Sequence, residues 1–156
     1  MRKRDRTWVC FFFMISILFL LPAVQPSASS DALQLITEEE ARQFIDGYVA
    51  RYIELQIDPF MALFSKQAIE NRMLPYGDIH ELYRKTFVNS NSVNYRLKIY
   101  TVQCDSHCAS VRGRYELVQS VKNKIRPRTF GGDILWKLVR EDGELRIEAM
   151  NYGRSR

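Results

Sequence analysis

The spacing of apolar residues changes once along this chain, near Val93, and that change limits the folds it can adopt. Before this point apolar residues recur three or four positions apart, as in Phe44, Ile45 and Tyr48, which is typical of a helix with one buried face. After it they alternate with polar residues, as strands with one buried face do. Helical segments followed by alternating segments predict an α+β fold, with helices on one face of a curved antiparallel sheet.

Three helices are expected before the change of period. Residues 37–40, Thr-Glu-Glu-Glu, have the spacing of a capping box and predict the start of the first helix. Asp58 predicts the start of a short second helix. Residues 74–77 predict a turn, after which Asp78 and Glu81 predict the start of a third. The expected buried positions are Ala41, Phe44, Ile45, Tyr48, Tyr52, Leu55, Phe60, Leu63, Phe64, Ile79, Leu82, Tyr83 and Phe87.

Four strands are expected after the change of period, and Asp142-Gly143 predicts a tight hairpin between the last two. Alternation assigns one set of side chains to the inner face of the sheet. This set is Val93, Tyr95, Leu97, Ile99, Ala109, Val111, Gly113, Tyr115, Leu117, Ile134, Trp136, Leu138, Leu145, Ile147 and Ala149.

This order of elements resembles the superfamily of nuclear transport factor 2, ketosteroid isomerase and the SnoaL-like polyketide cyclases. The resemblance spans residues 38–152 and is carried by residues 44–48, by 58–65 and by the ending from Ile134 to Ile147. It implies a sheet that wraps the helices as a cone with a pocket at its open end. The superfamily contains enzymes and non-enzymes, so the fold does not assign a function.

An enzyme of this kind needs an ionisable group that points into the cone, where burial can tune its pKa. The inner positions above include no Asp, Glu, His or Lys. Glu116, Asp133 and Glu148 fall in the opposite phase, and Asp46 and Glu54 lie off the buried stripe of the first helix. The sequence therefore favours a non-catalytic domain that binds a small ligand or an envelope protein, without a cofactor or metal.

The alternative is an isomerase, dehydratase or cyclase in which His80 is the base and a tyrosine such as Tyr83 donates a hydrogen bond. His80 follows the expected start of the third helix, which equally suits an ordinary surface histidine. Several aromatic residues either line a ligand pocket or fill the core. They are Tyr48, Tyr52, Tyr83, Tyr95 and Trp136.

Cys104 and Cys108 flank the turn expected between the first two strands. Facing residues at the neck of a hairpin lie within disulfide range, and an oxidising compartment favours the bond, so we expect a disulfide. Free thiols are one alternative. A metal site with His107 is another, but a structural zinc site needs a fourth ligand.

The net charge of +5 is concentrated at the N-terminus. Four of the 23 basic and one of the 18 acidic residues lie within the first 30, which leaves the remainder at +2. Nucleic acid is therefore not expected as a partner. A basic cluster near the second and third strands suits either an anionic partner or a solvated strand end. It comprises Arg112, Arg114, Lys122, Lys124, Arg126 and Arg128.

The first 30 residues have the layout of a secretory signal peptide: basic residues, an apolar run from Trp8 to Leu21, and small residues up to Ser30. The apolar run is shorter than the 20 or so residues that span a membrane, which disfavours a retained anchor. We therefore expect a signal peptide at 1–30, a lead-in at 31–36 and one domain at 37–156. The mature protein would be periplasmic or secreted, with no stable membrane span.

Self-association through the outer face of the sheet is also expected, because apolar residues recur in the outward phase of several strands. The residues assigned to this homodimer interface are Val118, Leu135 and Val139. Val102 shares their phase, and Tyr100 and Met150 join them if their strands keep register.

Overall fold

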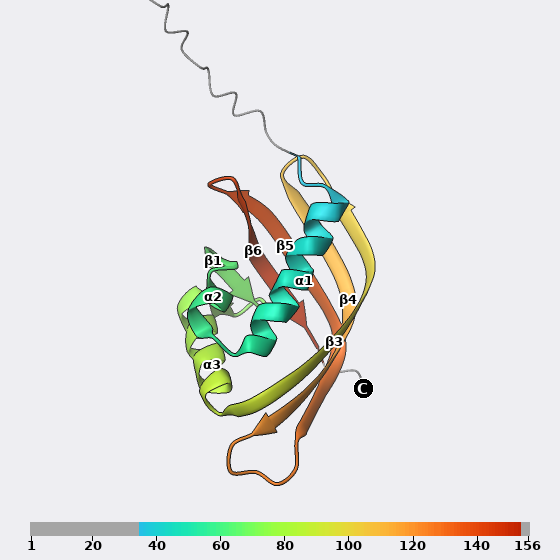
Figure 1. The fold of residues 1–156 in the computed structure, drawn as a ribbon. Coiled ribbons are helices and arrows are strands. Elements are labelled where there is room, and N and C mark those ends of the chain that lie inside the picture. Colours follow the sequence, from blue (N-terminus) through green and yellow to red (C-terminus); the bar gives the residue numbers. More distant parts are fainter. Residues whose placement is uncertain (1–34, 154–156) are drawn as a thin grey trace, which may run out of the picture. The chain divides into compact units, whose positions relative to one another are not determined.

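The computed structural model describes residues 35–153, which belong to one compact unit. Three helices lie against one face of a strongly curved six-stranded sheet (Figure 1). The strand order is β2-β1-β6-β5-β4-β3, and every pair is antiparallel except β1 with β6. The elements are α1 (Glu38–Glu54), α2 (Ile57–Met61), β1 (Phe64–Glu70), β2 (Leu74–Pro75), α3 (Tyr76–Val88), β3 (Ser90–Cys104), β4 (Cys108–Val121), β5 (Arg128–Glu141) and β6 (Glu144–Tyr152). The predicted α+β class is confirmed, although the sheet is mixed.

Helix α1 begins as its sequence predicts. Thr37 caps it, since its Oγ1 accepts a hydrogen bond from the Glu40 amide at 3.1 Å. The Glu40 carboxylate does not complete the capping box. It forms an ion pair at 2.7 Å with Arg140 of β5, which fixes the start of the helix to the sheet. The predicted signal peptide and most of the predicted lead-in lie outside the described residues.

The predicted starts of α2 and α3 are wrong. Helix α2 begins at Ile57, and α3 begins at Tyr76 directly after Pro75, without a side-chain cap in either case. Leu74 and Pro75 pair with the end of β1, so the chain passes from a strand straight into a helix where a turn was predicted. Glu81 is not a capping residue, because its carboxylate pairs with basic residues one turn later on α3.

Strand β1 was not predicted, because its apolar residues do not alternate. Phe64 and Ser65 are both buried and the next two residues are both exposed. The strand pairs in parallel with β6, where Phe64 lies opposite Ile147. This register brings Glu70 to the inner face of the sheet, where its side chain is fully buried.

Two register shifts overturn parts of the predicted alternation. A shift between Ile99 and Thr101 places Val102 opposite the buried Val111, so Val102 faces inward. A second shift, where β5 meets β6, pairs Met150 with Trp136, and both are buried. Met150 therefore takes the inner position that was predicted for Ala149. On β4 and β5 the inner positions from Ala109 to Leu138 follow the predicted alternation.

The core between the helices and the sheet is mainly aromatic. Tyr48 of α1 lies 5.2 Å from Phe60 and 5.5 Å from Trp136, measured between ring centroids. Phe60 in turn lies 4.8 Å from Tyr83 of α3. Tilted and edge-on contacts of this kind stabilise a core beyond the area they bury. Of these rings, Tyr48 and Tyr83 also line the cavity described next.

Candidate functional site

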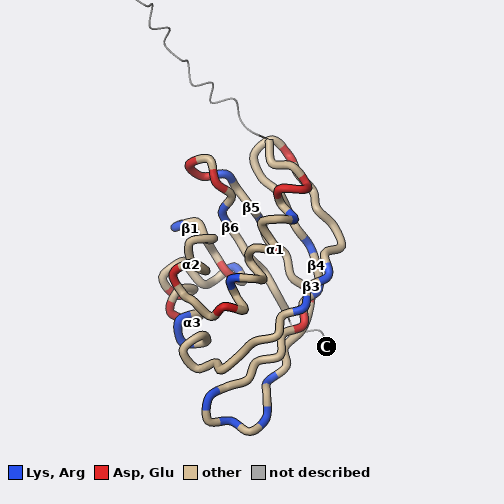
Figure 2. The backbone as a smooth tube through the Cα atoms, in the orientation of Figure 1, with Lys and Arg blue, Asp and Glu red and all other residues tan. Residues whose placement is uncertain are grey.

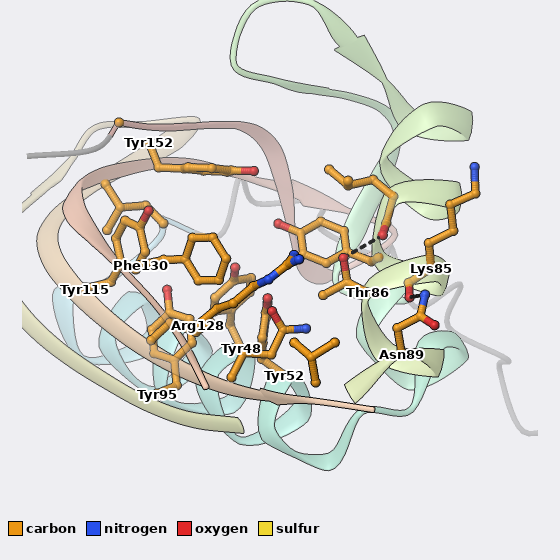
Figure 3. Close-up of a pocket in the computed structure, with 17 residues that line it drawn as sticks. Tyr48, Tyr52, Lys85, Thr86, Asn89, Tyr95, Tyr115, Arg128, Phe130 and Tyr152 are labelled. Atoms are coloured by element: carbon orange, nitrogen blue, oxygen red, sulfur yellow. Dashed lines mark hydrogen bonds between the residues drawn. The ribbon is translucent and has the colours of Figure 1, made fainter. Parts of the chain in front are cut away.

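A cavity of about 590 Å³ lies between helices α1 and α3 and the inner face of the sheet. Its size is within the range of small-molecule sites, roughly 300–1,000 Å³. Figure 3 shows its lining side chains converging from α1, α3 and strands β3 to β6. The lining residues are Tyr48, Tyr52, Leu82, Tyr83, Lys85, Thr86, Asn89, Tyr95, Tyr115, Leu117, Gln119, Val121, Arg128, Phe130, Ile134, Tyr152 and Gly153.

Four of the five aromatic residues proposed from sequence lie on this wall: Tyr48, Tyr52, Tyr83 and Tyr95. Trp136 does not. It is fully buried behind Tyr48, and its indole Nε1 has no hydrogen-bond partner among the described residues. Sequence reasoning missed Tyr115 and Tyr152 as wall residues. Tyr115 was assigned to the inner face but not to the pocket, and Tyr152 follows the register shift in β6.

The wall tyrosines are neutral hydrogen-bonding groups. Burial is the main cause that raises the pKa of Tyr48, Tyr52, Tyr83 and Tyr95 above its ordinary value. The Tyr48 hydroxyl donates to the Met150 sulfur at 3.6 Å. At physiological pH these hydroxyls can therefore donate or accept hydrogen bonds, but none is available as a phenolate base.

Behind this wall lies a buried acid that the sequence did not reveal. The Tyr152 hydroxyl donates a hydrogen bond to Glu70 Oε1, whereas Glu70 Oε2 has no hydrogen-bond partner among the described residues. Burial raises the pKa of Glu70, and interactions with the Tyr152 and Tyr83 hydroxyls lower it by less. Glu70 is not among the lining residues, so a molecule in the cavity would meet Tyr152 and Tyr83 first.

Two basic side chains, Lys85 of α3 and Arg128 at the start of β5, are the charged groups among the lining residues. The Lys85 ammonium pairs with Glu81 at 3.2 Å. Arg128 extends into the cavity in Figure 3 and forms no ion pair or hydrogen bond with the other described residues. Arg128 was predicted only as one member of a basic surface cluster.

His80 does not lie on the cavity wall. It is partly exposed on α3, and within residues 35–153 no hydrogen bond joins it to Asp46, Glu116 or Asp133. The geometry on which the His80 enzyme hypothesis depends is therefore not found. Tyr83, its proposed partner, does line the cavity.

The predicted disulfide is not formed, and both Cys104 and Cys108 are free. Cys104 lies opposite Ala109, so Cys104 and Cys108 belong to opposite phases of the hairpin and point to opposite faces. The error was to assume that these two cysteines face each other across the turn. The turn is held by the Asp105 carboxylate, which accepts hydrogen bonds from the Cys108 amide at 3.0 Å and the His107 amide at 3.3 Å. No group of three or more His, Cys, Asp or Glu side chains that could hold a metal occurs in the described part of the chain.

The residues proposed for a dimer interface do not form one continuous band. Leu135 and Val139 are half-buried on β5, with the Lys137–Glu148 ion pair between them on the outer face. Val118 lies opposite Thr129, well along the sheet from this pair. The interface remains a prediction, with Leu135 and Val139 at its centre.

The basic cluster divides into two parts. Arg112 and Arg114 face outward on β4, and Arg114 approaches Asp133 at 3.7 Å. The other members lie along the loop between β4 and β5 and at the start of β5, where Figure 2 shows basic residues gathered at one end of the fold. They are Lys122, Lys124, Arg126 and Arg128.

No protein-family model and no curated protein matches the chain. Several solved structures are similar to it in fold. A ketosteroid isomerase-like protein from Erwinia carotovora atroseptica has a TM-score of 0.63 at 17% identity, over 78% of this chain and 99% of that one. A nuclear transport factor 2-like superfamily protein from Salmonella enterica serovar Typhimurium has a TM-score of 0.66 at 13% identity, over 76% and 90% of the two chains.

A hexachlorocyclohexane dehydrochlorinase is also similar, with a TM-score of 0.62 at 6% identity, over 74% of this chain and 83% of that one. At these identities the likeness concerns the fold, which agrees with the order of helices and strands that suggested the superfamily. The chain therefore has the cone-shaped α+β fold of the nuclear transport factor 2-like and SnoaL-like superfamily.

Proposed function

We propose that this domain binds a small, largely apolar molecule in the tyrosine-lined cavity and does not transform it. The observation that carries the proposal is the cavity itself. The aromatic core packs closely around Phe60 and Trp136, yet a cavity of about 590 Å³ stays open beside this core. Protein interiors leave few voids larger than a water molecule, so a space of this size is most simply a binding site.

The chemistry of the wall favours binding over catalysis. The lining residues include no Asp, Glu or His, and the wall tyrosines stay protonated. Glu70 is the nearest candidate for a base, but Tyr152 and Tyr83 separate it from the open space. A ligand in this cavity would meet apolar ring faces and neutral hydroxyl groups, which suit recognition of a molecule with few polar atoms.

A dye that fluoresces in apolar surroundings tests this proposal. We expect saturable binding of N-phenyl-1-naphthylamine to the wild type. Thr86→Trp should weaken it at least tenfold, because Thr86 lines the cavity and the added ring would occupy it. Val88→Trp is the matched control: it adds the same ring to the same helix at a position 57% exposed and off the wall.

Equal binding by the two variants would place the dye elsewhere, and no saturable binding by the wild type would refute the proposal. Near-ultraviolet circular dichroism of each variant checks that the core is intact.

One observation favours a second candidate, an enzyme of the isomerase or dehydratase type: the hydrogen bond from Tyr152 to the buried Glu70. Burial favours the neutral form of Glu70. In that form the Glu70 O–H can donate to the Tyr152 oxygen, which leaves the Tyr152 hydroxyl to donate to a substrate oxygen as charge develops there. Conversion of a β,γ-unsaturated ketone to its conjugated isomer, lost in Tyr152→Phe, would support this candidate. Turnover that is absent, or unchanged by Tyr152→Phe, would count against it.

We further propose that the domain works outside the cytosol, after removal of residues 1–30. The support is the order of basic, apolar and small residues in that segment. In the described part of the chain, no helix is long and apolar enough to cross a membrane. Sequencing the N-terminus of protein from its host should give a start near Asp31. Soluble cytosolic protein that keeps Met1 or Arg2 would contradict export.

A further inference from the structure

Arg128 is the arginine among the residues that line the cavity, and it differs from the arginines that form ion pairs elsewhere in the described chain. Arg42, Arg84 and Arg146 each pair with a carboxylate on their own helix or strand, at 2.8 Å, 2.7 Å and 2.6 Å, respectively. Arg140 pairs with Glu40 across the fold. Arg128 is exposed at the mouth of the cavity, extends into it, and has no partner among residues 35–153.

The surroundings of Arg128 do not neutralise its charge. No acidic residue occurs between Glu116 and Asp133 in the sequence, and no Asp or Glu of residues 35–153 lines the cavity. Glu81 is engaged by Arg84 and Lys85 on α3. Glu70 lies behind Tyr152, and its raised pKa favours the neutral form. The mouth of the cavity is therefore positive, and its interior is uncharged.

Polar neighbours at the mouth already have internal partners. The Thr86 hydroxyl donates to the Leu82 carbonyl at 2.8 Å, and the Asn89 amide group donates to the Lys85 carbonyl at 2.8 Å. Arg128 is thus the charged lining residue without a partner among residues 35–153, and its guanidinium donors are free to bind a ligand. Its planar fork matches the two oxygens of a carboxylate or a similar acidic group.

We infer that the ligand is an organic anion with an apolar body, its acidic group held by Arg128 at the mouth and its body lying against the tyrosines. This inference rests on the proposed function, because it names the ligand class of that same cavity. The orientation follows from the cost of burying charge without a partner. The acidic end stays beside Arg128, and the apolar end enters between Tyr52, Tyr83 and Tyr95.

Two dyes that differ by one acidic group test the inference. 8-Anilino-1-naphthalenesulfonate carries a sulfonate on the ring system of N-phenyl-1-naphthylamine, which is neutral. We expect the wild type to bind the sulfonate dye more tightly. Arg128→Gln should weaken it by roughly 10- to 100-fold, as expected for loss of a charged hydrogen bond, and change the neutral dye less than twofold. Arg126→Gln is the matched control, since Arg126 lies in the loop that leads into Arg128 but not on the cavity wall.

Each contrary result has one meaning. Equal losses of sulfonate binding in Arg128→Gln and Arg126→Gln would indicate attraction to the basic loop and overturn the inference. If both dyes bind alike and Arg128→Gln changes neither, the anion preference is wrong although the cavity still binds. If neither dye binds the wild type saturably, the proposed function fails, and the inference with it.

Discussion

Glu70 is the residue whose surroundings differ most from what its chemical type would suggest. A carboxyl group is rarely fully buried unless it is paired, because removal from water disfavours the charged form. Among the described residues, Glu70 accepts a hydrogen bond from Tyr152 and forms no ion pair with a basic side chain. Its raised pKa means that the folded protein binds this proton more tightly than the unfolded chain does.

The pH dependence of stability follows from that difference. As pH rises from the ordinary value of 4.5 through the folded-state pKa, the free energy of unfolding should fall, because the native carboxyl must give up its proton in a buried site. Glu70→Gln cannot ionise, so its advantage over the wild type should grow across this interval, reaching about 1 kcal/mol or more once Glu70 is charged. Urea unfolding at pH 5 and pH 8 measures it. A constant difference between the two proteins would show that Glu70 does not titrate in this way.

For single residues, a position could be predicted where the local spacing of apolar residues is regular. Tyr48 and Tyr52 were placed correctly because α1 keeps one buried stripe throughout. Glu70 could not be placed, because the strand that carries it has no alternation to indicate a strand at all. Arg128 could be recognised as basic but not as part of a cavity, since the cavity forms only where residues of β5 and α3 meet the other lining residues in the fold.

At the level of the elements, the two register shifts decide which side chains face the core. From Val93 to Ile99 the sequence of β3 alternates without interruption, and nothing in it shows that Tyr100 is the extra residue. Gly113 lies opposite Ile99, beside this shift. A Cβ atom at Gly113 would come within 2.7 Å of the Lys98 carbonyl oxygen, so the two strands approach closely only because a side chain is missing.

Gly113→Ala should therefore weaken the pairing of β3 with β4. We expect a loss of about 2 kcal/mol in the free energy of unfolding, in the range of other overpacked sites. Gly77→Ala is the matched control, because Gly77 lies in the first turn of α3 with nothing within 4 Å of the added atom. It should be neutral, or stabilising by up to about 1 kcal/mol. Urea unfolding of both variants makes the comparison, and equal stability of the two would show that the close approach carries no cost.

For the whole molecule, the order of helices and strands was enough to predict the superfamily fold. Packing a three-helix layer on long antiparallel strands leaves few arrangements with short connections. The parallel contact of β1 with β6 was not predictable, because it joins segments from opposite ends of the domain. The open cavity was an expectation from the resemblance, and its positive mouth appears only when α3 and β5 are placed together.

The outer face of the sheet is where self-association is predicted. The register shifts remove Val102 and Met150 from this face, which leaves Leu135 and Val139 on either side of the Lys137–Glu148 ion pair. An apolar pair beside a satisfied ion pair suits a modest, non-obligate interface. In a twofold dimer each substitution acts on both copies. Leu135→Glu would bring two carboxylates into the interface and should convert the dimer to a monomer.

Sedimentation velocity at tens of micromolar measures this outcome. Ile53→Glu is the control, because Ile53 is an exposed apolar residue on α1, away from the outer face of the sheet. It should leave the dimer intact. A monomeric wild type would contradict self-association as a whole. A dimer that survives Leu135→Glu unchanged would place the interface elsewhere, since two charges facing each other across a symmetric contact cannot be buried there without a large loss of affinity.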